Sequence, residues 1–141
     1  MEIKENVMKL VRKYYTRNPF ELAAALNIRV IFEELGSING YYNKQLRMKQ
    51  IHINCNLDEH MQIYTCAHEL GHATMHPNAN TPFLRNQTLL SVDRLEIEAN
   101  KFAVELLISD SDLKQYEEYT IDQVAQIYGY QKKLIELRIR R

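Results

Sequence analysis

The amino-acid sequence predicts a mostly helical α+β domain in which a small antiparallel sheet of three strands precedes a helix with metal-ligand spacing. Apolar residues recur at helical spacing near both ends of the chain, and three short alternating segments lie between residues 28 and 54. The stretch His68-Glu69-Leu70-Gly71-His72 then follows on a helical pattern. These three observations define the expected order of elements.

The chain is long enough for one core, and we expect a single domain over residues 1–141. Its N-terminus is too charged for a signal peptide, and no apolar run approaches the length of a membrane span. Cys55 and Cys66 fit reduced thiols better than a disulfide scaffold. We therefore expect a cytoplasmic protein with no membrane partner. The net charge of zero gives no global electrostatic reason for nucleic-acid binding, which we do not expect.

Two helices are predicted before the sheet. Four apolar residues at helical spacing define the first helix: Val7, Leu10, Val11 and Tyr14. Asn18 can cap the second helix, Pro19 suits its first position, and Asn27 is a suitable end.

Three strands are predicted over residues 28–33, 40–43 and 48–54 from their alternating or β-rich patterns. Lys44 and Gln45 are expected to form the turn between the last two strands. We expect the third strand to lie at the edge of the sheet, where it could pair with an extended peptide and place its scissile bond across a metal.

A helix is predicted from the capping residue Asp58 to a stop at Pro77. On such a helix His68 and His72 project from one face about one turn apart, where both can bind one zinc ion. Glu69 would point beside the ion toward its water. The two histidines are predicted metal ligands, and Glu69 is the predicted catalytic residue.

A third metal ligand must come from another part of the chain, and residues 94–103 offer two carboxylates on a helical pattern. Glu96 borders the apolar face of this helix, whereas Glu98 lies on its solvated side, so Glu96 is favoured while Glu98 stays an alternative. Small residues at 99 and 103 would let the helix approach the histidine helix closely at Gly71.

For several residues near these motifs, two interpretations remain open. Residues 77–90 lack a clear period and form either a lid over the cleft or an ordinary surface loop. His76 is either a partly exposed residue of the last helical turn or a group that supports the site or substrate. His76, Tyr41 and Tyr42 are unranked candidates to assist at the oxyanion. His52 and His60 have no partner pattern and are expected to be surface or packing residues.

These motifs resemble the ImmA/IrrE family of metallopeptidases, with a likeness that extends over about residues 15–140. It rests on Asn54, the motif from His68 to His72 with His76, the segment 96–107 and the opening segment 18–28. The resemblance implies a zincin-like, more narrowly gluzincin-like, domain with Zn²⁺ held by His68, His72 and a glutamate of the second motif, and with Glu69 as catalytic residue.

The resemblance also implies a biological role and adds two details. Members act inside bacteria as site-specific proteases that cleave a helix-turn-helix repressor, often on phages or integrative elements. Asn100 matches a position where gluzincins commonly place a polar supporting group, which again favours Glu96. Where the family usually has Leu-Leu-Met-Pro, this chain has Leu106-Leu107-Ile108-Ser109.

Two other functions remain open from the sequence. Thr120 and Gln123 form a capping-box pattern, Gly129 suits a helix-turn-helix turn, and the following helix is basic, so residues 110–141 could contact DNA. Alternatively, the chain could be a catalytically silent zinc-containing module that sequesters a repressor or an antitoxin-type partner. The intact Glu69 favours catalysis, because binding alone needs no base.

Overall fold

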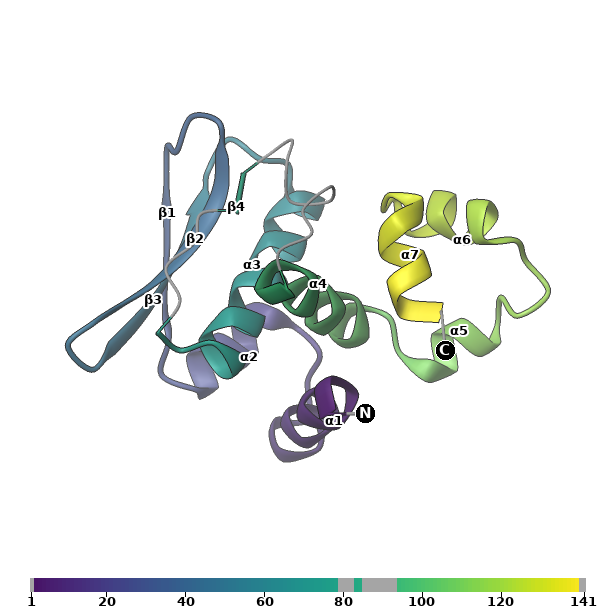
Figure 1. Cartoon of the computed structure of the whole chain (residues 1–141), viewed down its shortest axis with the longest axis horizontal. Coiled ribbons are helices and arrows are strands. Elements are labelled where there is room, and N and C mark those ends of the chain that lie inside the picture. The colour runs from purple at the N-terminus through teal and green to yellow at the C-terminus, as the bar shows by residue number, and fades with distance from the viewer. Residues whose placement is uncertain (1, 79–82, 85–93, 140–141) are drawn as a thin grey trace.

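A computed structural model describes residues 2–78, 83–84 and 94–139 of the chain (Figure 1). The elements follow in the order α1 (Glu2–Tyr14), α2 (Pro19–Ala25), β1 (Arg29–Glu33), β2 (Ile38–Gln45), β3 (Met48–Asn54), α3 (Glu59–Met75), β4 (Phe83–Leu84), α4 (Arg94–Leu107), α5 (Asp110–Lys114), α6 (Ile121–Tyr128) and α7 (Lys132–Ile139). This arrangement confirms the predicted mostly helical α+β class.

The helix ends follow the capping signals of the sequence. The side chain of Asn18 accepts hydrogen bonds from two backbone N–H groups at the start of α2, and Asp58 does the same for one N–H of α3. Thr120 and Gln123 form the predicted capping box of α6, and Gly129 ends that helix with a φ of 71°. Local side-chain chemistry therefore sets these boundaries.

The sheet is mixed, and in this respect the prediction of an antiparallel sheet is wrong. Its strand order is β1-β3-β2-β4, with β1 parallel to β3 and with β2 antiparallel to both β3 and β4. The sequence pattern does not distinguish the two directions, because alternation is the same in parallel and antiparallel strands. The short strand β4 adds a fourth member that was not predicted.

The expected edge strand β3 lies inside the sheet. It pairs with β1 on one side and with β2 on the other, so a peptide cannot add to it. Its side chains Ile51 and Ile53 are fully buried, which explains its central position. Pairing also continues to Gln45 and Met48, and the turn therefore falls at residues 46–47 rather than at Lys44 and Gln45.

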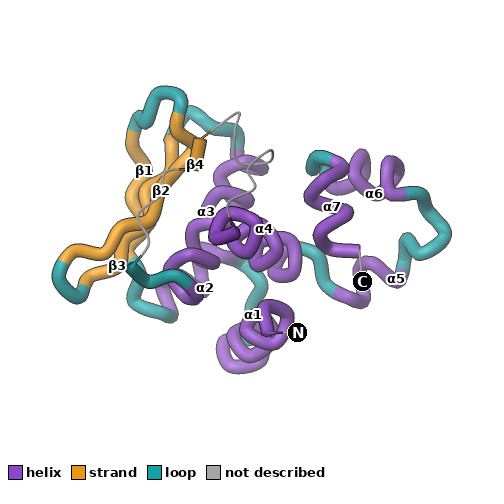
Figure 2. Tube along the Cα trace, viewed as in Figure 1, coloured by secondary structure: helices purple, strands orange, loops and turns teal. Residues whose placement is uncertain are grey.

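The helices pack on the sheet and on one another around a core that includes both sheet and helix side chains. Helix α3 contacts β2 and β3, and α2 contacts β1 (Figure 2). Helix α4 crosses α3 where Gly71 meets Phe102, and a Cβ built on Gly71 would lie 3.0 Å from the Cβ of Phe102. The predicted close approach at Gly71 is thus confirmed, and it places the two motif-bearing helices side by side.

A second, smaller cluster of buried side chains lies under the C-terminal helices. It consists of Ile108, Val124, Ala125 and Ile135. Leu107 and Tyr130 pack against both this cluster and the main core, and so connect the two. Ser109 caps α5 by accepting a hydrogen bond from the N–H of Asp112. The family that the sequence resembles usually has proline at this position.

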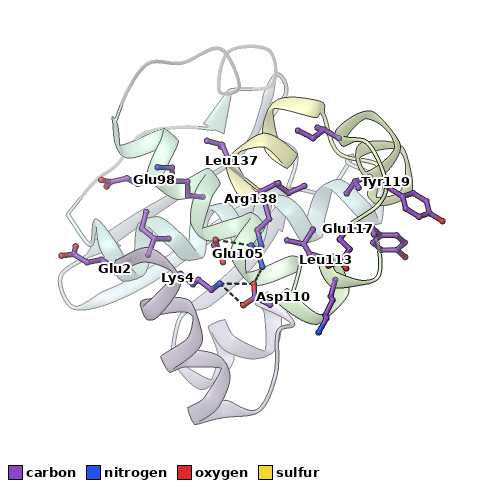
Figure 3. A pocket seen from close by; sticks show the side chains of 17 residues that line it. Glu2, Lys4, Glu98, Glu105, Asp110, Leu113, Glu117, Tyr119, Leu137 and Arg138 are labelled. Carbon is purple, nitrogen blue, oxygen red and sulfur yellow. Dashed lines mark hydrogen bonds and ion pairs between the residues drawn. The ribbon is translucent and has the colours of Figure 1, made fainter. Parts of the chain in front are cut away.

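Arg138 of α7 attaches this C-terminal part to the rest of the chain (Figure 3). Its buried guanidinium donates to the carbonyl of Ile108 at 2.9 Å and to Asp110 at 2.6 Å, and it lies 3.6 Å from Glu105. Lys4 of α1 also pairs with Asp110 at 2.8 Å. One of the basic residues of the C-terminal helix that could have contacted DNA is therefore committed to internal contacts.

Part of the predicted loop over residues 77–90 is described. Phe83 and Leu84 pair with β2, whereas residues 79–82 and 85–90 lie outside the described residues, so the lid hypothesis falls largely on them. Within the described ranges, no helix has the length and apolar character that a membrane crossing requires.

Candidate metal centre

Helix α3 carries three of the predicted site residues in its buried segment. His68, Glu69 and His72 are each at most 1% exposed. The two imidazole rings lie 5.0 Å apart between centroids and are nearly perpendicular, as expected for positions one helical turn apart. The helix thus presents both rings to the same interior space.

Helix α4 brings Glu96 to the two histidines. Glu96 Oε2 lies 3.1 Å from His68 Nε2, and Glu96 Oε1 lies 2.7 Å from His72 Nε2. One donor atom from each of the three side chains lies within 4.8 Å of the others, so that among the described residues this group could hold a metal ion. Glu98 lies apart from the cluster and instead contacts His76 and Arg94.

The Nδ1 atoms of both histidines have partners of their own. His68 Nδ1 lies 2.9 Å from Asn100 Oδ1, which also accepts a hydrogen bond from the Tyr64 hydroxyl at 2.5 Å. His72 Nδ1 lies 3.0 Å from His76 Nδ1. When each Nδ1 carries the proton, both Nε2 lone pairs face the Glu96 carboxylate.

This donor set fits a divalent metal ion. Two Nε2 lone pairs and a carboxylate that face one another repel unless a proton or a metal cation lies between them. Imidazole nitrogens and a carboxylate oxygen are ligands that zinc commonly takes in catalytic sites, and here they lie within 4.8 Å of one another. His68, His72 and Glu96 are therefore the residues that could hold a metal.

Burial tunes the protonation of the cluster. It lowers the pKa of His68 and so favours the neutral imidazole that a metal requires. Burial by itself would raise the pKa of Glu96, but hydrogen bonds that His68 and His72 donate from Nε2, and the positive charge these rings carry when protonated, outweigh it and hold this pKa at about 2. Glu96 is consequently ionised at neutral pH.

Glu69 has a different environment from Glu96. Both of its carboxylate oxygens are buried, and neither has a hydrogen-bond partner among the described residues. Burial, assisted by the charge of Glu96, raises its pKa well above the usual range. A buried carboxylate without a fixed partner in the described part of the chain, beside candidate metal ligands, suits proton transfer, because it is free to bind and release a proton.

The remaining candidates take other positions. Tyr42 is buried and donates to the carbonyl of Pro77 at 2.7 Å, while the Tyr41 ring stacks on His52 with a centroid distance of 4.2 Å. His60 contacts the carbonyl of Gly129 as a packing residue, as predicted. Sequence reasoning missed Tyr64, although its position four residues before His68 on one helix was an available signal.

A large cavity lies away from the cluster. It has a volume of about 1160 Å³ and opens between α1, α4 and the C-terminal helices (Figure 3). Glu98, Glu105 and Arg138 line it, but His68, His72 and Glu96 do not. The cavity is therefore not the metal centre.

Two buried imidazoles and a carboxylate, with a second carboxylate beside them, define the type of site found in metal-dependent hydrolases. The chain belongs to peptidase family M78, described as the IrrE N-terminal-like domain, which matches residues 23–140. This family consists of metallopeptidases, in agreement with the resemblance seen in the sequence motifs.

Two relatives cover nearly the whole chain. An uncharacterized immunity region protein 2 of Bacillus phage phi105 is 48% identical over 139 residues, which are 96% of this chain and 88% of the relative. Metallopeptidase ImmA of Bacillus subtilis strain 168 is 33% identical over 135 residues, which are 94% of this chain and 75% of the relative.

Proposed function

We propose that this chain is a zinc-dependent endopeptidase with His68, His72 and Glu96 as metal ligands and Glu69 as catalytic residue. We also propose that it acts in the cytoplasm, as one domain over residues 1–141, and that its substrate is a helix-turn-helix repressor in a phage or mobile-element switch. The observation that carries the proposal is the convergence of His68 Nε2, His72 Nε2 and the Glu96 carboxylate within 4.8 Å.

The chemistry follows from the donor set. A bound zinc ion would polarise the scissile carbonyl and acidify the attacking water. Glu69, buried beside the two histidines, would act as general base toward the attacking water and as general acid toward the leaving amine. His68 and His72 are oriented through their Nδ1 contacts, and the buried surroundings of Glu69 strengthen its interactions with charge that develops nearby.

The relatives support the substrate class. One is named for a phage immunity region and the other is named a metallopeptidase, and both are similar to this chain over almost its whole length. These names favour a protease that acts on a regulatory protein of a phage. A repressor encoded beside this gene is therefore the first substrate to test.

The test combines metal analysis with cleavage. Zinc per chain is measured for wild type, His72→Ala and Glu69→Gln, and each protein is incubated with the neighbouring helix-turn-helix protein while products are followed by intact mass. We expect one zinc in wild type and in Glu69→Gln, little in His72→Ala, and cleavage by wild type alone. The Glu69→Gln loss should be at least about 10²-fold in rate.

Each contrary result has a separate meaning. Equal cleavage by wild type and Glu69→Gln would remove Glu69 from the mechanism. Tight zinc binding in wild type, together with stable complex formation and no cleavage of the repressor, would support the silent sequestering module. Absence of zinc from wild type after zinc is supplied would refute the metal centre.

A further inference from the structure

A chain of hydrogen bonds extends from the candidate metal ligand His72 to the carboxylate that is not a ligand. His72 Nδ1 lies 3.0 Å from His76 Nδ1, and His76 Nε2 lies 2.7 Å from Glu98 Oε1. Glu98 in turn accepts a hydrogen bond from Arg94 at 3.1 Å. His76 and Glu98 thus have defined contacts that the ligand set itself does not require.

The proton positions along this chain follow once the His72 Nε2 lone pair is given to a metal ion, because Glu96 beside that nitrogen is also only an acceptor. A carboxylate only accepts, so a neutral His76 donates from Nε2 to Glu98, and its Nδ1 is then an acceptor. His72 must therefore donate from Nδ1 to His76, which leaves the lone pair of His72 on Nε2. That lone pair lies on the side of Glu96, 2.7 Å from its Oε1.

The end of helix α3 places the rings of His72 and His76 next to each other. His76 is four residues after His72 and caps α3, with its own N–H bonded to the His72 carbonyl at 2.7 Å. Its side chain is 10% exposed and that of Glu98 is 27% exposed, so water competes little for the His76 contacts. Arg94 is 88% exposed and contributes weakly.

The other candidate ligand is supported by different chemistry. His68 donates to the amide oxygen of Asn100, a neutral group that the Tyr64 hydroxyl also contacts. His72 instead donates to an imidazole that a carboxylate polarises. The centre is therefore asymmetric, with one histidine supported by a neutral amide and the other by an anionic relay.

We propose that His76 and Glu98 are positioning residues that fix the ring orientation and tautomer of His72 and thereby strengthen metal binding. The inference rests on the proposed metal centre and assigns new roles around it. Partners of this kind typically change metal affinity by about 10- to 100-fold when removed.

The test is the zinc affinity of wild type and four variants, measured by competition with a chromophoric chelator at neutral pH. His76→Leu removes both ring nitrogens and should weaken zinc binding by about 10- to 100-fold. His76→Asn keeps an acceptor at the position of Nδ1 and should retain most of the affinity. Glu98→Gln keeps the shape but removes the charge, and we expect a smaller loss than in His76→Leu.

His60→Leu is the matched control. It removes another imidazole from α3, one that stacks on Tyr130 and contacts the Gly129 carbonyl away from Glu96. It should affect stability without changing zinc affinity. An effect of His60→Leu as large as that of His76→Leu would show that any loss of packing on α3 weakens the centre, which would overturn the positioning role.

NMR of the zinc-loaded proteins supplies a direct readout of the tautomer. The Nδ1 proton of His72 should exchange slowly with water in wild type and His76→Asn, and should be lost to exchange in His76→Leu. If His76→Leu does not fold, Glu98→Gln and His76→Asn still test the proposal. Wild-type zinc affinity and an unchanged His72 Nδ1 signal in Glu98→Gln would contradict the anionic relay.

Failure of this inference is distinguishable from failure of the proposed function. If wild type itself binds no zinc, the metal centre is refuted and the positioning role with it. If wild type binds zinc tightly and His76→Leu binds it equally well, only the roles of His76 and Glu98 are refuted.

Discussion

Gly71 and Phe102 meet so closely that a Cβ on Gly71 would lie 3.0 Å from the Cβ of Phe102. This contact sets the separation of α3 and α4. Because His68 and His72 lie on one helix and Glu96 on the other, the same separation determines whether three ligand atoms can converge. Packing at a glycine is thus part of the metal centre.

Gly71→Ala should destabilise the protein even though alanine is the better helix former. Replacing glycine gains about 1 kcal/mol of helix propensity, while overpacking against Phe102 costs roughly 1–3 kcal/mol. We expect a net loss of up to about 2 kcal/mol in urea unfolding, together with weaker zinc binding because α4 is pushed away. If Gly71→Ala is more stable than wild type and binds zinc normally, α3 and α4 can accommodate the added methyl group without moving apart.

Glu96→Ala should reduce zinc retention far more than Glu98→Ala. The first substitution removes a donor that faces both histidines, whereas the second removes a group that acts through His76. Metal content after dialysis against a weak chelator gives the order. A larger loss in Glu98→Ala would reverse the ligand assignment.

Asp110 should make stability depend on pH in the acid range. Hydrogen bonds from Lys4 and Arg138 lower its pKa from 3.8 to about 2. The folded state therefore releases this proton more readily than the unfolded chain, and the resulting stability is present above pH 3.8 and lost as the pH falls toward 2.

Asp110→Asn tests this effect. The variant should be less stable than wild type at neutral pH, and the difference should shrink as the pH falls from 3.8 toward 2. Because the carboxylate is 63% exposed, solvent screening limits the contribution of its pKa shift to about 1 kcal/mol or less. Urea unfolding at several pH values gives the measurement, and a constant difference across this range would contradict the assignment.

Duplex DNA binding should be absent or weak at physiological salt. Arg138 is buried against Ile108, Asp110 and Glu105, and Lys132 lies 3.5 Å from Asp122. We expect fluorescence anisotropy with labelled duplex to show no steep salt dependence.

Lys133→Glu is the sharper variant for this question. Removing the last ten residues would delete α7 and its buried Leu134 and Ile135, so that truncation would test folding instead. Lys133 is exposed, and reversing its charge should leave DNA affinity unchanged. A clear drop in salt-sensitive affinity on Lys133→Glu would revive the DNA-contact hypothesis.

The sequence by itself determined the features that depend on neighbouring residues. Asp58 and Pro77 bound α3, and the spacing of His68 and His72 places both rings on one face of it, because helix periodicity acts over a few residues. The helical phase of residues 94–106 likewise favoured Glu96 over Glu98, because only Glu96 borders the apolar face of that helix.

Only the tertiary structure decided how distant segments pair. The parallel pairing of β3 with β1, the burial of Arg138 and the contact of His76 with Glu98 each join residues at least 21 positions apart. Alternation along a strand does not reveal its neighbours, and a basic residue in a helix pattern does not reveal an acidic partner on another helix. These contacts arise when the core packs, because the burial of apolar surface fixes which faces meet and which polar groups must find partners there.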